Sequence, residues 1–396
     1  MSNLLEIIKT KSAAIKDEVI AIRRYLHQHP ELSFDEHHTS KYVCSKLDEY
    51  GIEYKTGMVK TGIVATISGK NPDKKLIALR ADLDALPIQE DNPVDYKSVN
   101  QGVMHACGHD VHTASLLGTA KILNELKDEF EGAVRLIFQP GEERLPGGAS
   151  LMIKEGVLKN PEPAGIVGQH VYPNLDAGKV GFRGGMYMAS ADEIYVTVHG
   201  EGGHAALPHF NIDPIIITAH ILTALQQLVS RAACPTIPTV LSFGKIIGDG
   251  ATNVIPDKVE LEGTFRTMDE EWRAVAHQKM KKMAEDIATS MGGSCDFRIE
   301  KGYPYLVNDE AMTNVAKTSA IAYLGKENVI DLDLRMTAED FSYYSQLIPA
   351  CFYRLGTRKP NGETLGLHTS TFDIDENALE TGIGLMAWIA INELGN

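Results

Sequence analysis

Residue types that bind transition metals are concentrated between positions 104 and 112, in the stretch Met104-His-Ala-Cys-Gly-His-Asp-Val-His. Imidazole and thiolate are ligands that suit zinc and neighbouring transition metals. Cys107 and His109 are separated only by Gly108, which lets the backbone turn tightly between them. A surface loop with one buried cysteine is the alternative interpretation, but so many ligand types in one short stretch favour a metal site. They are His105, Cys107, His109, Asp110 and His112.

A pair of adjacent glutamates, Glu142 and Glu143, follows the apolar run 133–138, which we expect to be a strand. In open α/β sheets, binding sites form outside the carboxyl ends of the strands. Adjacent carboxylates repel each other, so a pair that enters a site of low dielectric constant needs a cation there. One glutamate could then bind metal while the other takes a proton from the attacking water. Most Glu-Glu pairs are simply solvated, so the position of this one after a strand carries the argument.

Two histidines lie in separate segments and could complete the same site. His170 ends the apolar run Val167-Gly-Gln-His, and His368 lies in Leu367-His-Thr-Ser near the C-terminus. Each histidine alone is more often structural. Asp82 and Asp84 directly follow another apolar run, and a carboxylate there can hydrogen-bond the far nitrogen of a ligating histidine.

Three polar residues in the middle of the chain could bind an oxyanion or a carboxylate. His204 follows two glycines, Asn253 lies in a turn, and Arg266 ends a strand-like run. Imidazole, amide and guanidinium groups are suitable donors for these anions. Each of the three, taken alone, could equally be structural.

The elements that must position these residues alternate between strand and helix up to about residue 185. We expect helices over residues 3–28 and 110–126, and strands over 62–67, 76–79, 133–138 and 165–168. This order predicts an α/β layer with a mostly parallel sheet.

After residue 185 the expected order of strands and helices changes to β-α-β-β-α-β, which is typical of a small α+β domain. The expected elements are strands at 191–198, 238–247, 257–267 and 294–300, with helices at 212–231 and 269–291. Two sequential domains would fit this order. We prefer an insertion of 186–300 into a catalytic domain formed by 1–185 and 301–396, because the metal-type residues before and after it belong to one site.

Composition excludes several classes of function. The chain of 396 residues is 43% hydrophobic and carries a net charge of −15, which argues against nucleic acids and anionic membranes as partners. The longest apolar stretch, 212–228, is interrupted by polar residues, and the N-terminus does not resemble a secretory signal. The cysteines are odd in number and scattered, which predicts a reducing cytoplasm. They are Cys44, Cys107, Cys234, Cys295 and Cys351.

Taken together, these motifs resemble the metallo-amidohydrolases related to aminoacylase and the glutamate-releasing carboxypeptidase. The resemblance is strongest to the branch of hippurate hydrolases, indole-acetyl-amino-acid hydrolases and N-acetyldiaminopimelate deacetylases. It runs from Arg24-Tyr-Leu-His-Gln-His-Pro-Glu-Leu-Ser-Phe to Leu367-His-Thr-Ser-Thr-Phe-Asp-Ile-Asp-Glu. It implies a metallopeptidase-like catalytic domain, an inserted lid domain that also forms a homodimer, and two divalent ions per subunit (Zn, Mn, Co or Ni).

The resemblance also implies a role for each residue of the catalytic domain. Glu142 becomes the general base, and Asp82 matches the acidic position that supports the site. The segment Met336-Thr-Ala-Glu-Asp-Phe-Ser matches the branch and is expected at the pocket wall. Relatives often have Ala before the glutamate pair, and Gly141 here should loosen that turn. The implied metal ligands are Cys107, His109, Glu143, His170 and His368.

In the lid domain, the resemblance makes His204, Asn253 and Arg266 substrate-contacting residues, and His204 can reach the partner's site. We therefore predict hydrolysis of the amide bond of small N-acyl-L-amino acids, with acetyl, benzoyl or aryl-acetyl groups. A dipeptidase or carboxypeptidase with the same site is the main alternative. A non-catalytic binding protein is disfavoured, because the ligand set and the free glutamate are complete.

Overall fold

The computed structural model describes residues 2–359 and 365–395, which form two compact units. Unit 1 comprises Met1–Tyr187, Val307–Asp333 and Asp340–Asn396. Unit 2 comprises Met188–Leu306 and Leu334–Glu339, so the chain enters it twice.

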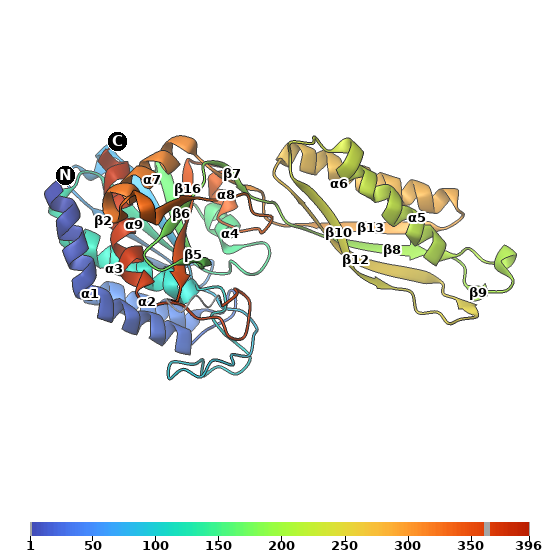
Figure 1. The fold of residues 1–396 in the computed structure, drawn as a ribbon, viewed down its shortest axis with the longest axis horizontal. Helices are drawn as coiled ribbons and strands as arrows, with labels where there is room; N and C mark the ends of the chain where they lie inside the picture. The colour runs from blue at the N-terminus through green and yellow to red at the C-terminus, as the bar shows by residue number, and fades with distance from the viewer. Residues whose placement is uncertain (1, 360–364, 396) are drawn as a thin grey trace. The chain divides into compact units, whose positions relative to one another are not determined.

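Unit 1 is built on an eight-stranded sheet (Figure 1). Its strands are β1 (Tyr54–Met58), β2 (Gly62–Ser68), β3 (Leu76–Asp82), β4 (Ala133–Gln139), β5 (Gly165–Asp176), β6 (Val180–Phe182), β15 (Val329–Asp331) and β16 (Ala350–Arg358). Their order across the sheet is β1-β2-β4-β3-β5-β16-β6-β15. The central neighbours β4, β3, β5 and β16 run parallel to one another. This confirms the predicted α/β class with a mostly parallel sheet.

The helices of unit 1 cover the central strands. They are α1 (Ser2–Gln28), α2 (His37–Glu49), α3 (His109–Glu125), α4 (Gly148–Lys154), α7 (Glu310–Leu324), α8 (Ser342–Ser345) and α9 (Ala378–Gly395). Every residue of β3 and β4 is buried, as expected of parallel strands covered on both faces. Helices α1, α3 and α9 contact one another, and α4 contacts α8. The sequence did not predict α2, whose residues are mostly polar.

The register of the central strands brings the predicted site residues to one edge. Asp82 pairs with Gln139 between β3 and β4, and Arg80 pairs with Gly168 between β3 and β5. His170 is therefore level with Asp82. The expectation that His170 ends its strand is wrong, because β5 continues to Asp176 by pairing with β16. Its pairing with β3 stops at Gly168, two residues before His170.

Unit 2 is an antiparallel sheet with two helices on one face (Figure 1). Its main elements are β8 (Asp192–His199), α5 (Pro214–Gln227), β10 (Thr239–Ile247), β12 (Lys258–Thr267), α6 (Glu270–Ser290) and β13 (Ser294–Lys301), the predicted β-α-β-β-α-β order. Burial alternates along β8 and β12, because only one face is covered. In the same unit, the short strands β9 (Gly203–His204) and β11 (Val254–Ile255) form a pair. The strands β7 (Gly185–Met188) and β14 (Leu306–Asn308) also pair, and most of their residues belong to unit 1.

One helix among the described residues, Pro214–Ala232, is long and apolar enough to cross a membrane by length and composition alone. Asp213, one of the polar residues in the stretch 212–228, caps the helix by accepting hydrogen bonds from the amides of Ile215 and Ile216. Ile217 and Leu225 are buried in the core of unit 2. Core helices pass the same test, so one such helix is weak evidence. The absence of a membrane partner stays a prediction.

Candidate metal centre

The turn before α3 aims Cys107 and His109 at the same region. Gly108, between them, has φ +84°, and a Cβ atom there would lie 2.5 Å from Val171 Cγ2. Only glycine fits this close approach of the turn to β5. Cys107 Sγ lies 3.6 Å from His170 Nε2 and 3.4 Å from His368 Nε2. A residue of the loop before α3, a residue of β5 and a residue of the C-terminal segment thus converge.

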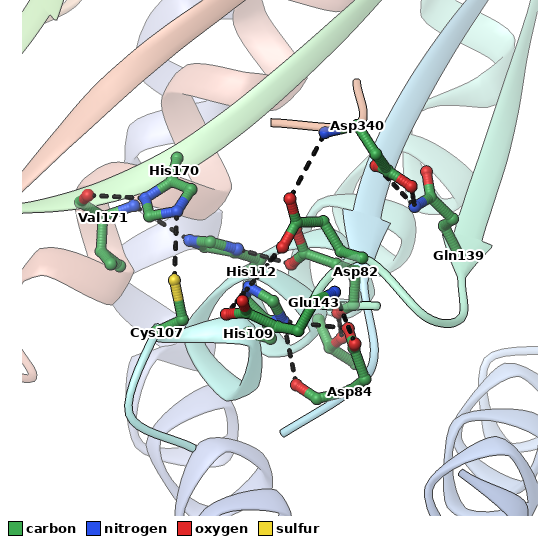
Figure 2. A network of polar contacts seen from close by, with 12 residues as sticks. Asp82, Asp84, Cys107, His109, His112, Gln139, Glu143, His170, Val171 and Asp340 are labelled. Carbon is green, nitrogen blue, oxygen red and sulfur yellow. Dashed lines mark hydrogen bonds and ion pairs between the residues drawn. The ribbon is translucent and has the colours of Figure 1, made fainter. Parts of the chain in front are cut away.

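The structure brings all five predicted ligands together, with Glu142 beside them. Figure 2 shows Cys107 and His170 facing each other, with His109 and Glu143 next to them. Potential ligand atoms lie within 4.8 Å of one another in three overlapping groups: Cys107, His109 and His170; Cys107, Glu143 and His368; His109, Glu142 and Glu143. Cys107 and His109 each belong to two of these groups, so the groups form one continuous cluster.

The hydrogen bonds of two histidines leave one ring nitrogen of each free for a metal. His109 Nδ1 lies 2.9 Å from the backbone oxygen of Asp84, and His170 Nδ1 lies 2.8 Å from that of Val171. Each Nδ1 is therefore the donor, and Nε2 carries the lone pair. His109 Nε2 and Glu143 Oε1 are buried and make no hydrogen bond within the described residues. Such atoms, 3.8 Å apart, fit a shared metal ion.

His112 is not available as a ligand, although its sequence position suggested one. Its Nδ1 donates to Asp82 Oδ1 at 2.6 Å, and its Nε2 accepts from the Val171 amide at 2.9 Å. Both ring nitrogens are occupied, and the ring lies between β3 and β5. Asp82 thus supports His112 directly (Figure 2), and its other oxygen lies 3.8 Å from His109 Nε2.

The other two polar residues of the stretch also face away from the cluster. Asp110 accepts from Arg23 Nε at 2.7 Å and lies 2.9 Å from His27 Nδ1, which ties α3 to α1. His105 is buried without a hydrogen bond in the described part of the chain, and burial lowers its pKa to about 4. Of the ligand types in the stretch, only Cys107 and His109 reach the site.

The electrostatics of the cluster favour positive charge. Burial lowers the pKa of His109, but Asp82 and Cys107 outweigh it and raise that pKa well above its usual value. Contacts of His368 Nε2 with Cys107 Sγ and with Glu143 Oε1, each at 3.4 Å, raise the pKa of His368 to about 10. Thiol and carboxylate groups that stabilise protons on imidazoles would stabilise a divalent cation in the same place. The donor set therefore fits a transition metal.

A buried network behind the cluster was missed by the sequence analysis. Arg80 Nη1 lies 2.5 Å from Asp82 Oδ2, and Arg80 Nη2 lies 2.8 Å from Asp340 Oδ1. Gln139 Nε2 donates to both oxygens of Asp340 at 2.8 Å (Figure 2). The backbone amide of Asp340 lies 3.3 Å from Glu142 Oε1. The predicted pocket-wall segment thus contacts the proposed base through Asp340.

Gly141 does not loosen the turn before Glu142, contrary to expectation. It has φ +61°, and a Cβ atom there would lie 2.3 Å from Phe34 Cε1. The Phe34 ring is packed against the turn, so glycine permits a closer fit. Two residues further on, the Glu143 amide donates to Asp84 Oδ2 at 2.9 Å.

The three remaining predicted residues lie in unit 2. His204 in β9 pairs with Val254 in β11, and the Ala205 amide donates to the backbone oxygen of Asn253 at 3.0 Å, so His204 and Asn253 lie on neighbouring segments of one two-stranded sheet. Arg266 lies in β12 and donates from Nη1 to the Met336 oxygen at 3.2 Å. Their roles in binding substrate stay predictions.

Comparison with known proteins places this chain among hydrolases. Residues 78–392 match Peptidase family M20/M25/M40. An N-acyl-L-amino acid amidohydrolase of Geobacillus stearothermophilus is 43% identical, over 76% of this chain and 81% of that protein. A thermostable carboxypeptidase of Saccharolobus solfataricus is 39% identical, over 98% of both. A dinuclear metal-binding M20 peptidase of Bacillus subtilis has a similar fold, with a TM-score of 0.83 and 36% identity over 97% of this chain and 99% of that one.

Proposed function

Because this chain belongs to Peptidase family M20/M25/M40 and is a metal-dependent amidohydrolase, we propose that it hydrolyses small N-acyl-L-amino acids with acetyl, benzoyl or aryl-acetyl groups. The observation that carries the proposal is the position of Glu142, a carboxylate that lies beside the five proposed metal ligands and is not one of them. Glu142 Oε2 lies 3.9 Å from His109 Nε2, while its other oxygen faces the Asp340 amide. A relative named as an N-acyl-L-amino acid amidohydrolase supports the substrate class.

We propose that two divalent transition-metal ions bind in each subunit, on Cys107, His109, Glu143, His170 and His368. The overlapping ligand groups and the dinuclear relative support this number. When bound, the ions polarise the amide carbonyl and make water more acidic. Thiolate, imidazole and carboxylate together admit Zn, Mn, Co or Ni.

Glu142 is the general base of this proposal. It takes a proton from the attacking water as the oxygen bonds to the amide carbon. It then gives that proton to the nitrogen as the C–N bond breaks, so that a carboxylic acid and an amine are released. Such a positioned base contributes roughly 10²–10⁴-fold to the rate. The Asp340 amide supports the role by orienting the carboxylate through a hydrogen bond to Oε1.

Unit 2 supplies the substrate contacts and the dimer contact in this proposal. The family resemblance implies that His204, Asn253 and Arg266 contact the substrate. His204 would stabilise the oxyanion, and Arg266 would bind the substrate carboxylate. Strand β10 is an edge of its sheet, and its residues Ile246 and Ile247 are 53% and 44% exposed. An exposed apolar edge is a ready site for pairing with a second copy, which supports a homodimer. The five free cysteines support a cytoplasmic location.

A carboxypeptidase acting on peptides is the second candidate, favoured by the relative of that name. Both candidates are tested by one panel of N-acetyl-, N-benzoyl- and indole-acetyl-amino acids and dipeptides, assayed after reconstitution with each metal. We expect kcat/KM to be highest for acylated amino acids. Higher values for dipeptides would favour the peptidase. No turnover of any member by metal-loaded protein would overturn both.

A further inference from the structure

Glu36 is a fully buried carboxylate for which the mechanism above has no role. We propose that Glu36 is a positioning residue that fixes the turn carrying Glu142 and Glu143. The inference rests on the proposed function of that turn, and it adds a residue from a distant segment of the chain. Glu36 lies before α2, more than a hundred residues from the turn.

The Glu36 carboxylate is held by hydrogen bonds to both oxygens. Oε1 accepts from the amide of Gly141 at 2.8 Å and from the amide of Phe34 at 2.9 Å. Oε2 accepts from the Thr61 hydroxyl at 2.7 Å. Because Gly141 directly precedes Glu142, this carboxylate holds the peptide between Pro140 and Gly141, one residue before the proposed base.

Asp84 acts on the other side of the same glutamate pair. It accepts the Glu143 amide at 2.9 Å and the Ser33 hydroxyl at 2.6 Å, so two buried carboxylates bind the backbone on both sides of Glu142. Burial, followed by the nearby charge of Asp84, raises the pKa of Glu36 to about 7. Two carboxylates are thus buried close together, and both contribute hydrogen bonds to this one turn.

Helix capping does not explain the Glu36 side chain. Glu36 occupies the N-cap position of α2, where a side chain usually accepts from the first amides of the helix, but its side chain makes no such bond. Glu31 does this instead, accepting from the amides of His38 at 2.8 Å and Thr39 at 2.9 Å. The Glu36 side chain is directed to the catalytic turn, while Glu31 stabilises the helix.

This division of roles provides a matched control. Glu31 and Glu36 are glutamates of one segment, and both accept backbone amides, but only Glu36 contacts the turn. We expect Glu36→Ala to lower kcat by roughly 10- to 100-fold, since displacing a catalytic group by about 1 Å costs up to 100-fold, with KM changed less than kcat. Glu36→Gln keeps an oxygen that can accept the Gly141 amide, and should restore kcat to within about threefold of the native protein.

Amide hydrogen exchange of the peptide containing residues 140–144 gives a readout independent of activity. Exchange there should be faster in Glu36→Ala than in native protein, and nearly native in Glu36→Gln. Glu31→Ala should accelerate exchange at the start of α2 and leave the turn unchanged. If Glu36→Ala does not fold, Glu36→Asp, which shortens the side chain by one carbon, should show the same pattern more weakly.

Three outcomes separate this inference from the proposed function. Native kcat and native exchange in both Glu36→Ala and Glu36→Asp would overturn it. A Glu36→Gln protein as impaired as Glu36→Ala would also overturn it, because charge and not the hydrogen bond would then matter. Full activity of Glu142→Gln would instead refute the proposed function of the turn, whatever Glu36 does.

Discussion

Replacing Glu142 or Glu143 by glutamine separates the two carboxylates of the pair, because the structure gives them different surroundings. Glu142 Oε1 faces the Asp340 amide at 3.3 Å, and glutamine can accept the same hydrogen bond. The bond contributes about 1 kcal/mol, so Glu142→Gln should change the free energy of unfolding by no more than about that amount. The amide cannot take up a proton, so kcat should fall roughly 10²–10⁴-fold.

Glu143→Gln should act on metal binding. Glu143 Oε1 lies 3.4 Å from His368 Nε2 and 3.8 Å from His109 Nε2, among the proposed ligands. Removing its charge should weaken metal affinity by at least the roughly 10- to 100-fold that is typical for losing a partner of a ligand. Its backbone amide still binds Asp84, so the turn should keep its conformation.

The assay compares kcat, metal content and thermal unfolding for both variants and the native protein. Metal content is measured by mass spectrometry after dialysis against a graded series of chelator concentrations. We expect Glu142→Gln to hold metal like native protein while turning over slowly, and Glu143→Gln to lose metal at lower chelator concentrations. The reverse pattern would show that the two roles are exchanged. Equal effects of the two substitutions on kcat and on metal content would refute the separate roles of Glu142 and Glu143.

Three further predictions follow from the ligand cluster and the turn. Chelator should abolish activity and a divalent transition metal should restore it, with two ions bound per subunit at saturation; full activity in metal-free protein would contradict this. A thiol-alkylating reagent should modify Cys107 faster in metal-free than in metal-loaded protein, since a bound thiolate has its electron pair engaged; peptide mass spectrometry measures this, and equal rates would contradict it. Gly141→Ala should lower the free energy of unfolding by at least about 1 kcal/mol, since φ is positive there and the Phe34 ring must move; an unchanged denaturation midpoint would show that the turn adapts.

Local sequence patterns predicted the parallel sheet and the clustering of the ligands. Apolar runs followed by acidic or histidine residues identified β3, β4 and β5, and parallel strands bring such residues to one edge. His170 lies at this edge of the sheet even though β5 continues beyond it. Its position is set by the register of β5 with β3, and not by the end of β5. Sequence alone gave no register, so the level of His170 relative to Asp82 could not be predicted.

The residues that support the site were missed because their partners are far away in sequence. Arg80 and Asp340 are 260 positions apart and form a buried ion pair. An arginine within an apolar run gives no local signal of such a partner. Glu36 was missed for the same reason, since its side chain binds the amide of Gly141, more than a hundred residues away in sequence.

The distribution of charge in unit 1 shows which charges a bound metal would compensate. Behind the site, Asp82 is compensated by Arg80, and Arg80 also pairs with Asp340, so the protein supplies its own cation there. Among the proposed metal ligands, Glu143 faces His109 and His368. Imidazoles that bind metal are neutral, so in the metal-bound protein they cannot compensate Glu143. A thiolate and two glutamates would then be left together in a partly buried site, where unpaired charge is costly. Divalent ions bound at the proposed ligands would therefore supply the counter-charge on this side of the sheet.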